Sequence, residues 1–118
     1  MSNKGWIAVD LDGTLAHYDG WKGTAHIGEP VPRMLARVKA WLAEGKDVRI
    51  FTARVSPVSC SINNEKVEDV RNRIFEWCHT HIGQAISITH EKDLSMIELW
   101  DDRCVQVIPN TGERVDGK

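Results

Sequence analysis

The sequence predicts an α/β fold built around a mainly parallel sheet, and two observations lead to this class. Short apolar runs alternate with longer segments whose apolar residues recur every three or four positions, in the order strand, helix, strand, helix, strand. The length of 118 residues, of which 42% are hydrophobic, fits one domain with a packed core. We therefore expect residues 1–118 to form a single domain.

Five runs are predicted to form strands. The first is almost continuously apolar, as expected for a strand covered on both faces, and the last two are short candidates near the C-terminus. In chain order the runs are Trp6–Leu11, Asp47–Thr52, Ala85–Thr89, Met96–Trp100 and Val105–Ile108.

Two helices are predicted between these strands. Apolar side chains recur at the spacing of one helix face over Val31–Leu42, and again over Val67–His81. Asn63 or Asn64 would cap the start of the second helix.

Three segments show no such pattern. Residues 16–29 and 53–62 are expected to be irregular, and residues 110–118 are expected to form a loose tail. Neither a repeat nor a linker-like stretch divides the chain, which again favours one domain.

The composition excludes several classes of protein. A net charge of -2, from 15 basic and 17 acidic residues, gives no electrostatic footprint for nucleic acid. No apolar run approaches the ~20 residues that span a bilayer, and no export signal is recognised at the N-terminus. Cys60, Cys78 and Cys104 lack paired spacing and are expected to be reduced thiols. These features favour a cytoplasmic protein that does not bind membranes.

The strongest chemical signal is a pair of acids at the end of the first strand. Asp10 and Asp12 are two residues apart, so their carboxylates start out on one side of the chain, and Gly13 lets the chain turn away. Ligands of parallel sheets bind beyond the carboxyl ends of the strands, where this pair lies. The alternative, turn-forming aspartates, accounts less well for two acids after a fully apolar run.

A second pair, Asp101 and Asp102, follows the strand predicted at Met96–Trp100. If that strand is parallel to the first, four carboxylates meet at one edge of the sheet and cannot all stay ionised without a counter-charge. A hard divalent cation, most simply Mg²⁺, resolves this conflict, with help from Lys92. The alternative is a solvated pair in a loop, balanced by Arg103.

Thr52 ends the second strand and is a candidate phosphate-binding residue. Its hydroxyl, together with the groups of Ala53 and Arg54 that follow, is well placed to hold a phosphate oxygen. Lys92 follows the third strand. Taken singly, a threonine at the end of a strand is usually only a strand-forming residue, and most lysines in such loops are simply solvated. A surface ion pair accounts for Arg54 equally well.

Taken in order, these residues resemble the four motifs of the haloacid dehalogenase (HAD) superfamily of phosphatases and phosphotransferases. The resemblance covers about residues 6–108 and implies a three-layer Rossmann-like HAD fold. The matching residues are Asp10-Leu11-Asp12-Gly13-Thr14, Phe51-Thr52, Lys92 and Trp100-Asp101-Asp102. No cap domain is expected, because residues 16–29 have only the length of a flap.

The resemblance also implies a mechanism. Asp10 would attack phosphorus and form an aspartyl-phosphate, and Asp12 would protonate the leaving oxygen and then activate water. Mg²⁺ would be held by the Asp10 side chain, the Asp12 backbone carbonyl and Asp102. Asp101 would contact the metal directly or through water.

Thr52 and Lys92 would bind the phosphoryl oxygens in this mechanism, and Lys92 would also balance negative charge around Asp10. Without a cap the site is open, so selectivity must come from the flap, a neighbouring subunit or a macromolecular substrate. The flap carries aromatic and basic side chains that would either contact substrate or only pack the loop onto the sheet. They are His17, Tyr18, Trp21, Lys22 and His26.

The leading functional hypothesis is a Mg²⁺-dependent phosphomonoester hydrolase that acts on a phosphorylated substrate through Asp10. A narrower version is a phosphatase for nucleotides or nucleic-acid ends, favoured by the aromatic flap but not by the net charge. The competing class is a non-catalytic module that binds a phosphorylated ligand on the same fold. Its signature would be the loss of Asp10 or Asp12, and both are present. The sequence leaves the natural substrate and the oligomeric state open.

Overall fold

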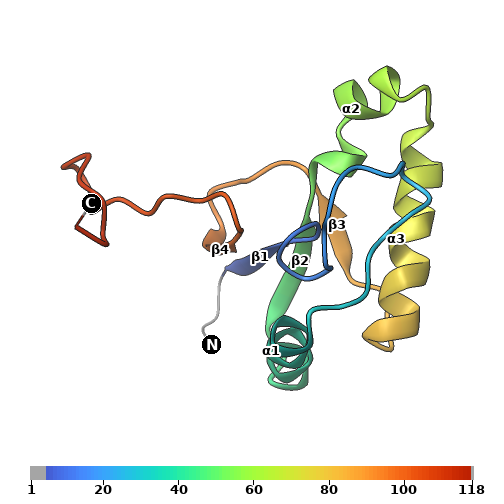
Figure 1. Cartoon of the computed structure of the whole chain (residues 1–118). Helices are drawn as coiled ribbons and strands as arrows, with labels where there is room; N and C mark the ends of the chain where they lie inside the picture. Colours follow the sequence, from blue (N-terminus) through green and yellow to red (C-terminus); the bar gives the residue numbers. More distant parts are fainter. Residues whose placement is uncertain (1–4, 118) are drawn as a thin grey trace.

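The computed structural model describes residues 5–117, which contain four strands in one sheet. All neighbouring strands are parallel, and their order across the sheet is β3-β2-β1-β4 (Figure 1). The strands are β1 (Trp6–Asp10), β2 (Asp47–Phe51), β3 (Ser87–Thr89) and β4 (Met96–Trp100). The predicted α/β class with a parallel sheet is thus confirmed.

Helices connect the strands. As predicted, α1 (Pro32–Ala43) lies between β1 and β2, and α3 (Val67–His81) lies between β2 and β3. The stretch predicted to be irregular after β2 instead contains a turn of 3-10 helix, η1 (Ala53–Val55), and the short helix α2 (Pro57–Ile62). With six residues, α2 is too short for a helical repeat to be recognised in the sequence.

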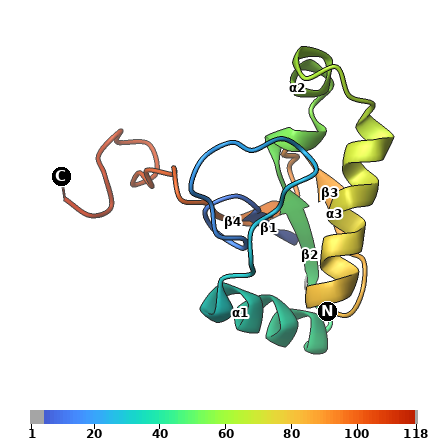
Figure 2. The same ribbon diagram turned by 45° about the vertical axis from the view of Figure 1, so that its right-hand side comes forward.

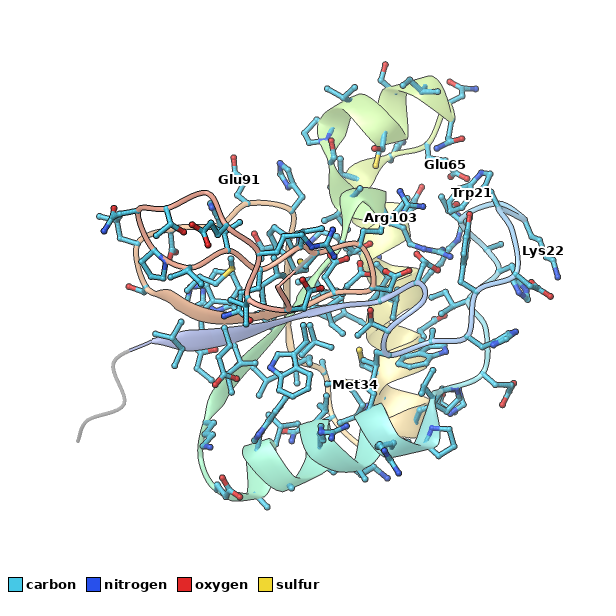
Figure 3. The ribbon with its side chains drawn as sticks, turned by 60° about the vertical axis from the view of Figure 1, so that its left-hand side comes forward. Trp21, Lys22, Met34, Glu65, Glu91 and Arg103 are labelled. Carbon is cyan, nitrogen blue, oxygen red and sulfur yellow. The ribbon has the colours of Figure 1, made fainter. Side chains whose placement is uncertain are left out.

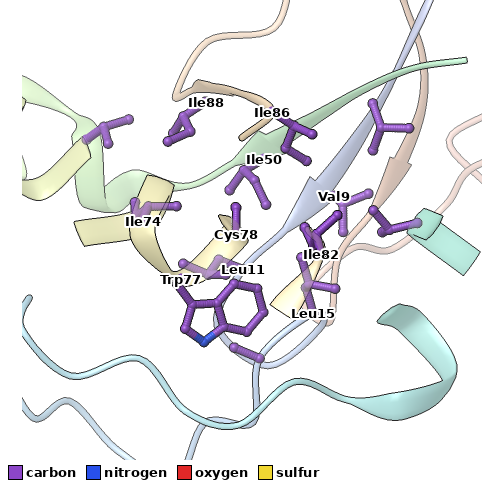
Figure 4. Close-up of a cluster of buried hydrophobic side chains, with 14 of the residues drawn as sticks. Val9, Leu11, Leu15, Ile50, Ile74, Trp77, Cys78, Ile82, Ile86 and Ile88 are labelled. Carbon is purple, nitrogen blue, oxygen red and sulfur yellow. The ribbon is translucent and has the colours of Figure 1, made fainter. Parts of the chain in front are cut away.

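One hydrophobic core lies between the sheet and the two long helices (Figure 4). Val9 of β1 and its register partner Ile50 of β2 are fully buried, in one cluster with Val38 of α1 and Ile74 of α3. Register partners point to the same face, so both helices cover that face. The preference for right-handed crossovers accounts for this, because the chain moves in one direction across the sheet from β1 to β2 to β3.

The other face differs from the predicted third layer. The connection from β3 back to β4 reverses direction and would place a helix there, but residues 90–95 are too few for a stable one. These residues cover Trp6 without helical structure. Trp6 Nε1 donates a hydrogen bond to Asp93 Oδ1 at 2.9 Å, and the guanidinium of Arg49 lies 4.5 Å from the centre of the indole ring. Trp6 is only 1% exposed as a result.

Residues 101–117 leave the sheet after β4 and are mostly exposed (Figures 1 and 2). The strand predicted at 105–108 is wrong: Val107 forms an isolated bridge with Arg114, and no strand of the sheet lies beside it. No helix within residues 5–117 has the length and apolar character needed to cross a membrane.

The predicted cap of α3 is also wrong. Lys66 occupies the N-cap position and makes no side-chain capping hydrogen bond. Asn64 has a φ of 56°, a left-handed conformation that asparagine tolerates, and belongs to the turn between α2 and α3.

Candidate active site

Three carboxylates converge where β1 and β4 end side by side. Val9 is the register partner of Trp100, so Asp10 and the two acids after β4 emerge at the same edge of the sheet. One oxygen of Asp10, one of Asp101 and one of Asp102 all lie within 4.8 Å of one another. Oxygen ligands at about 2.1–2.5 Å from a shared cation lie up to about 5 Å apart, so this cluster has the spacing of a hard-cation site.

The turn after β1 shapes this cluster. Gly13 has a φ of +90°, and a β-carbon at this position would lie 2.5 Å from Asp102 Oδ2. Glycine therefore allows Asp102 to approach the backbone that follows Asp10. On the other side, the backbone N–H of Arg103 donates to Asp101 Oδ1 at 2.7 Å, which fixes the direction of that carboxylate.

Burial and the crowding of acids raise the pKa of Asp10 from its ordinary value of 3.8 to about 7. Burial is the largest cause, followed by the charge of Asp101, a hydrogen bond with Asp102, the charge of Asp102 and the charge of Asp12. Burial and the charges of Asp101, Asp10 and Asp102 also raise the pKa of the Cys104 thiol. A cation at the cluster would favour the ionised carboxylates, and a donor set of hard oxygens suits Mg²⁺.

Among the described residues, the Asp12 side chain stands apart from this cluster and pairs with Arg54. Arg54 Nε donates to Asp12 Oδ2 at 2.7 Å, and Nη2 donates to Oδ1 at 2.8 Å. The same guanidinium donates to the backbone carbonyls of Thr24 at 3.3 Å and His26 at 2.9 Å. The described residues thus occupy four of its five N–H groups, although the sequence predicted that Arg54 would bind substrate.

The flap, residues 16–29, is anchored to α3 and to the segment that precedes it. Thr24 Oγ1 donates to Glu65 Oε1 at 2.7 Å, and Trp77 Nε1 donates to the carbonyl of Gly28 at 2.9 Å. The flap is therefore held in place over Arg54.

A cavity of about 550 Å³ extends from the carboxylates to the flap. Tyr18 and Trp21 line it and are 39% and 47% exposed, and the Trp21 ring centre lies 4.9 Å from the guanidinium carbon of Arg54. Figure 3 shows Trp21 on the flap and Lys22 pointing away from the body of the molecule, where it pairs with Asp19 at 3.0 Å. Of the flap side chains considered in the sequence, Tyr18 and Trp21 are thus placed to contact a ligand.

The structure brings most of the predicted site residues to this cavity. Gly13 adjoins it through Asp102, whereas Lys92 is exposed in the connection between β3 and β4 and does not line the cavity. The predicted residues that line it are Asp10, Asp12, Thr52, Ala53, Arg54, Asp101 and Asp102.

Five further lining residues were not assigned a role in substrate binding from the sequence, and one of them, Phe51, was named only as part of the second motif. His90 directly follows β3, and its place at the carboxyl end of a parallel strand is a signal that could have identified it. Ser56 and Ser59 were missed because α2 was not recognised. Arg103 was interpreted only as the partner of the neighbouring acids.

Comparison with known proteins informs the fold. A solved structure of a conserved protein from Bacteroides thetaiotaomicron matches 92% of this chain and 84% of its own length, with a TM-score of 0.61 and 22% sequence identity. At this identity the likeness shows a shared fold. No protein-family model and no curated protein matches the chain.

Proposed function

We propose that the chain is a Mg²⁺-dependent phosphomonoester hydrolase that acts through Asp10. The observation that carries this proposal is the convergence of Asp10, Asp101 and Asp102 beside a cavity that Asp12 and Thr52 also line. Phosphoryl transfer needs positioned groups and neutralised charge. These residues would supply the positioned groups, and a cation held by the carboxylates would supply the positive charge. The resemblance to the HAD motifs, in the same chain order, supports the same reaction.

Asp10, Asp101 and Asp102 would hold Mg²⁺, with the backbone carbonyl of Asp12 as a further ligand implied by the resemblance. When bound, the ion supplies positive charge for the carboxylates and for the phosphoryl oxygens.

The Asp10 carboxylate attacks phosphorus and forms an aspartyl-phosphate, while the bond from phosphorus to the leaving oxygen breaks. Asp12 donates a proton to that oxygen and the alcohol departs. Asp12 then takes a proton from water, whose oxygen attacks phosphorus. The bond between phosphorus and Asp10 breaks, which restores the carboxylate and releases inorganic phosphate.

Thr52 and a nearby cation would bind the phosphoryl oxygens. Thr52 Oγ1 accepts a hydrogen bond from the backbone N–H of Arg54 at 3.1 Å, so its own hydroxyl proton remains for a phosphate oxygen. We assign to Arg103 the charge balance that the resemblance gave to Lys92, because Arg103 lines the cavity and Lys92 does not.

A narrower substrate class, nucleotides or nucleic-acid ends, is favoured by Tyr18 and Trp21, because aromatic rings stack on bases. Values of kcat/KM for nucleoside monophosphates and for sugar phosphates test this idea. Trp21→Ala should lower kcat/KM only for the nucleoside monophosphates. An equal loss of kcat/KM for both substrate classes would indicate that the flap aromatics have a purely structural role.

The proposed activity is tested by phosphate release from an aryl phosphate in Mg²⁺ and in EDTA. Wild type should require Mg²⁺, and Asp10→Asn should lose at least about 10³-fold in kcat. Asp47→Asn is the control, since Asp47 begins β2 and lies beside the first residue of β1, at the other end of that strand from Asp10. Activity that survives Asp10→Asn would remove Asp10 as the nucleophile. Phosphate binding without turnover of any ester would favour the non-catalytic module.

A further inference from the structure

The contacts of Arg54 indicate a role other than binding substrate. We infer that Arg54 is a positioning residue, which holds Asp12 in place for proton transfer and ties that position to the flap. The inference rests on the proposed function, because Asp12 transfers protons only in that reaction.

The pairing of Arg54 with Asp12 restricts both side chains. Both Asp12 oxygens accept a hydrogen bond from the guanidinium, at 2.7 and 2.8 Å, and this two-point contact selects one orientation of the carboxylate. The side chains are 5% and 20% exposed, so water screens the pair only weakly. An arginine engaged in this way has little capacity left to grip a phosphate.

The flap supplies the remaining contacts of the guanidinium. The carbonyls of Thr24 and His26 accept its other hydrogen bonds, and the Trp21 ring lies against it. The Arg54 backbone is fixed separately, because its N–H donates to Thr52 Oγ1 at the end of β2. Arg54 therefore joins the turn after β1, the end of β2 and the flap at one point.

This arrangement divides the four acids into a group of three that would bind a cation and one that would transfer protons. Asp10, Asp101 and Asp102 face one another at the spacing of a cation site, while the charge of Asp12 is balanced by Arg54. Without Arg54, the Asp12 carboxylate would be unpaired close to Asp10 and free to turn away from the leaving oxygen. Loss of Arg54 should therefore weaken proton donation and leave phosphate binding intact.

The kinetic test compares Arg54→Met with Arg49→Met as a matched control. Arg49 also makes a two-point contact, with Asp47 at 2.9 and 3.2 Å, and lies over the Trp6 ring, but on a part of the sheet outside the cavity. Arg54→Lys keeps the charge without the fork of donors and serves as the second variant if Arg54→Met does not fold.

An ester with an alkyl leaving group needs a proton from Asp12, whereas a nitrophenolate leaves without one. We expect kcat/KM of the Arg54 variants to fall about 10²-fold for the alkyl ester and less than about 5-fold for the nitrophenyl ester. Inhibition by inorganic phosphate should stay unchanged. In an Asp12→Asn background, removal of Arg54 should add no further loss. Equal losses for both esters with weaker phosphate inhibition would make Arg54 a phosphate ligand and overturn the inference.

Hydrogen exchange of the flap amides tests the link to the flap in the absence of turnover. Arg54→Met and Arg54→Lys should speed exchange in residues 17–28, and Arg49→Met should not. If the wild type hydrolyses no ester, the proposed function fails, and this measurement still decides whether Arg54 holds the flap. Unchanged flap exchange in both Arg54 variants would overturn the inference.

Discussion

Replacing Gly13 with alanine is expected to damage the carboxylate cluster far more than it damages the fold. The φ of +90° at Gly13 lies in the left-handed region that other residues rarely adopt. The added β-carbon would lie 2.5 Å from Asp102 Oδ2 and 2.9 Å from its Cγ, where ordinary contacts begin near 3.4 Å. Asp102 is exposed, so it can relieve the clash by withdrawing into solvent by about 1 Å.

Two magnitudes follow from this geometry. The left-handed backbone costs an alanine about 1 kcal/mol of unfolding free energy. Metal–ligand distances tolerate deviations of only about 0.2 Å, and a misplacement of about 1 Å at a reacting centre lowers the rate about 10²-fold. The expected result is therefore a modest loss of stability with a large loss of activity.

Gly45→Ala is the matched control. Gly45 has a φ of +81°, nothing lies within 4 Å of an added β-carbon, and the residue is outside the cavity. Urea unfolding should show similar losses of stability for both variants. Only Gly13→Ala should lose about 10²-fold in kcat/KM and require about 10-fold more Mg²⁺ for half-maximal activity. A wild-type dependence on Mg²⁺ in Gly13→Ala would refute the placement of Asp102 at the cation.

Three further predictions concern proton binding, the core and the cations of the site. Without Mg²⁺, the unfolding free energy of wild type relative to Asp10→Asn should fall as the pH rises from about 5 to about 7. The reason is that folded Asp10, with its pKa raised to about 7, holds its proton more tightly than the unfolded chain does. Urea unfolding at each pH measures the difference, and an unfolding free energy of wild type that rises with pH relative to that of Asp10→Asn would contradict the prediction. Ile74→Ala, at a fully buried position, should lose about 2–5 kcal/mol in the same assay, against at most about 0.5 kcal/mol for Ile62→Ala at a position that is 79% exposed. In steady-state kinetics, Lys92→Ala should keep kcat/KM within about twofold of wild type, and Arg103→Ala should lower it at least about 10-fold. A larger loss for Lys92→Ala than for Arg103→Ala would assign the charge balance at the site to Lys92 instead.

The strands and long helices could be predicted because their signals are local. α3 (Val67–His81) and β4 (Met96–Trp100) begin and end where the residue pattern placed them. Residues 105–108 include types that favour strands, but they do not form a strand of the sheet. Strand formation depends on a neighbouring strand to pair with, and a local sequence pattern does not reveal one. The absence of a helical layer on the second face of the sheet could have been predicted, because residues 90–95, which connect β3 to β4, are too few to form a stable helix.

The place of the acids could be predicted, but their partners could not. The carboxyl ends of parallel strands meet at one edge, so Asp10 and Asp102 had to lie near each other once β1 and β4 were neighbours. Arg54 is 42 residues from Asp12, and its choice between substrate and Asp12 depends on how the flap folds over it. Lys92 matches the motif order, but it lies in the connection that runs back from β3 to β4, and His90 lines the cavity in its place.

The most direct test of the proposed reaction is to locate the phosphoryl group during turnover. Wild type would be mixed with a phosphate ester and Mg²⁺, quenched in acid within the first turnover, and digested for peptide mass spectrometry. We predict a phosphoryl group on the peptide that contains Asp10, and none in Asp10→Asn or when EDTA replaces Mg²⁺. A phosphoryl group on any other residue, or hydrolysis that never labels the protein, would contradict the mechanism.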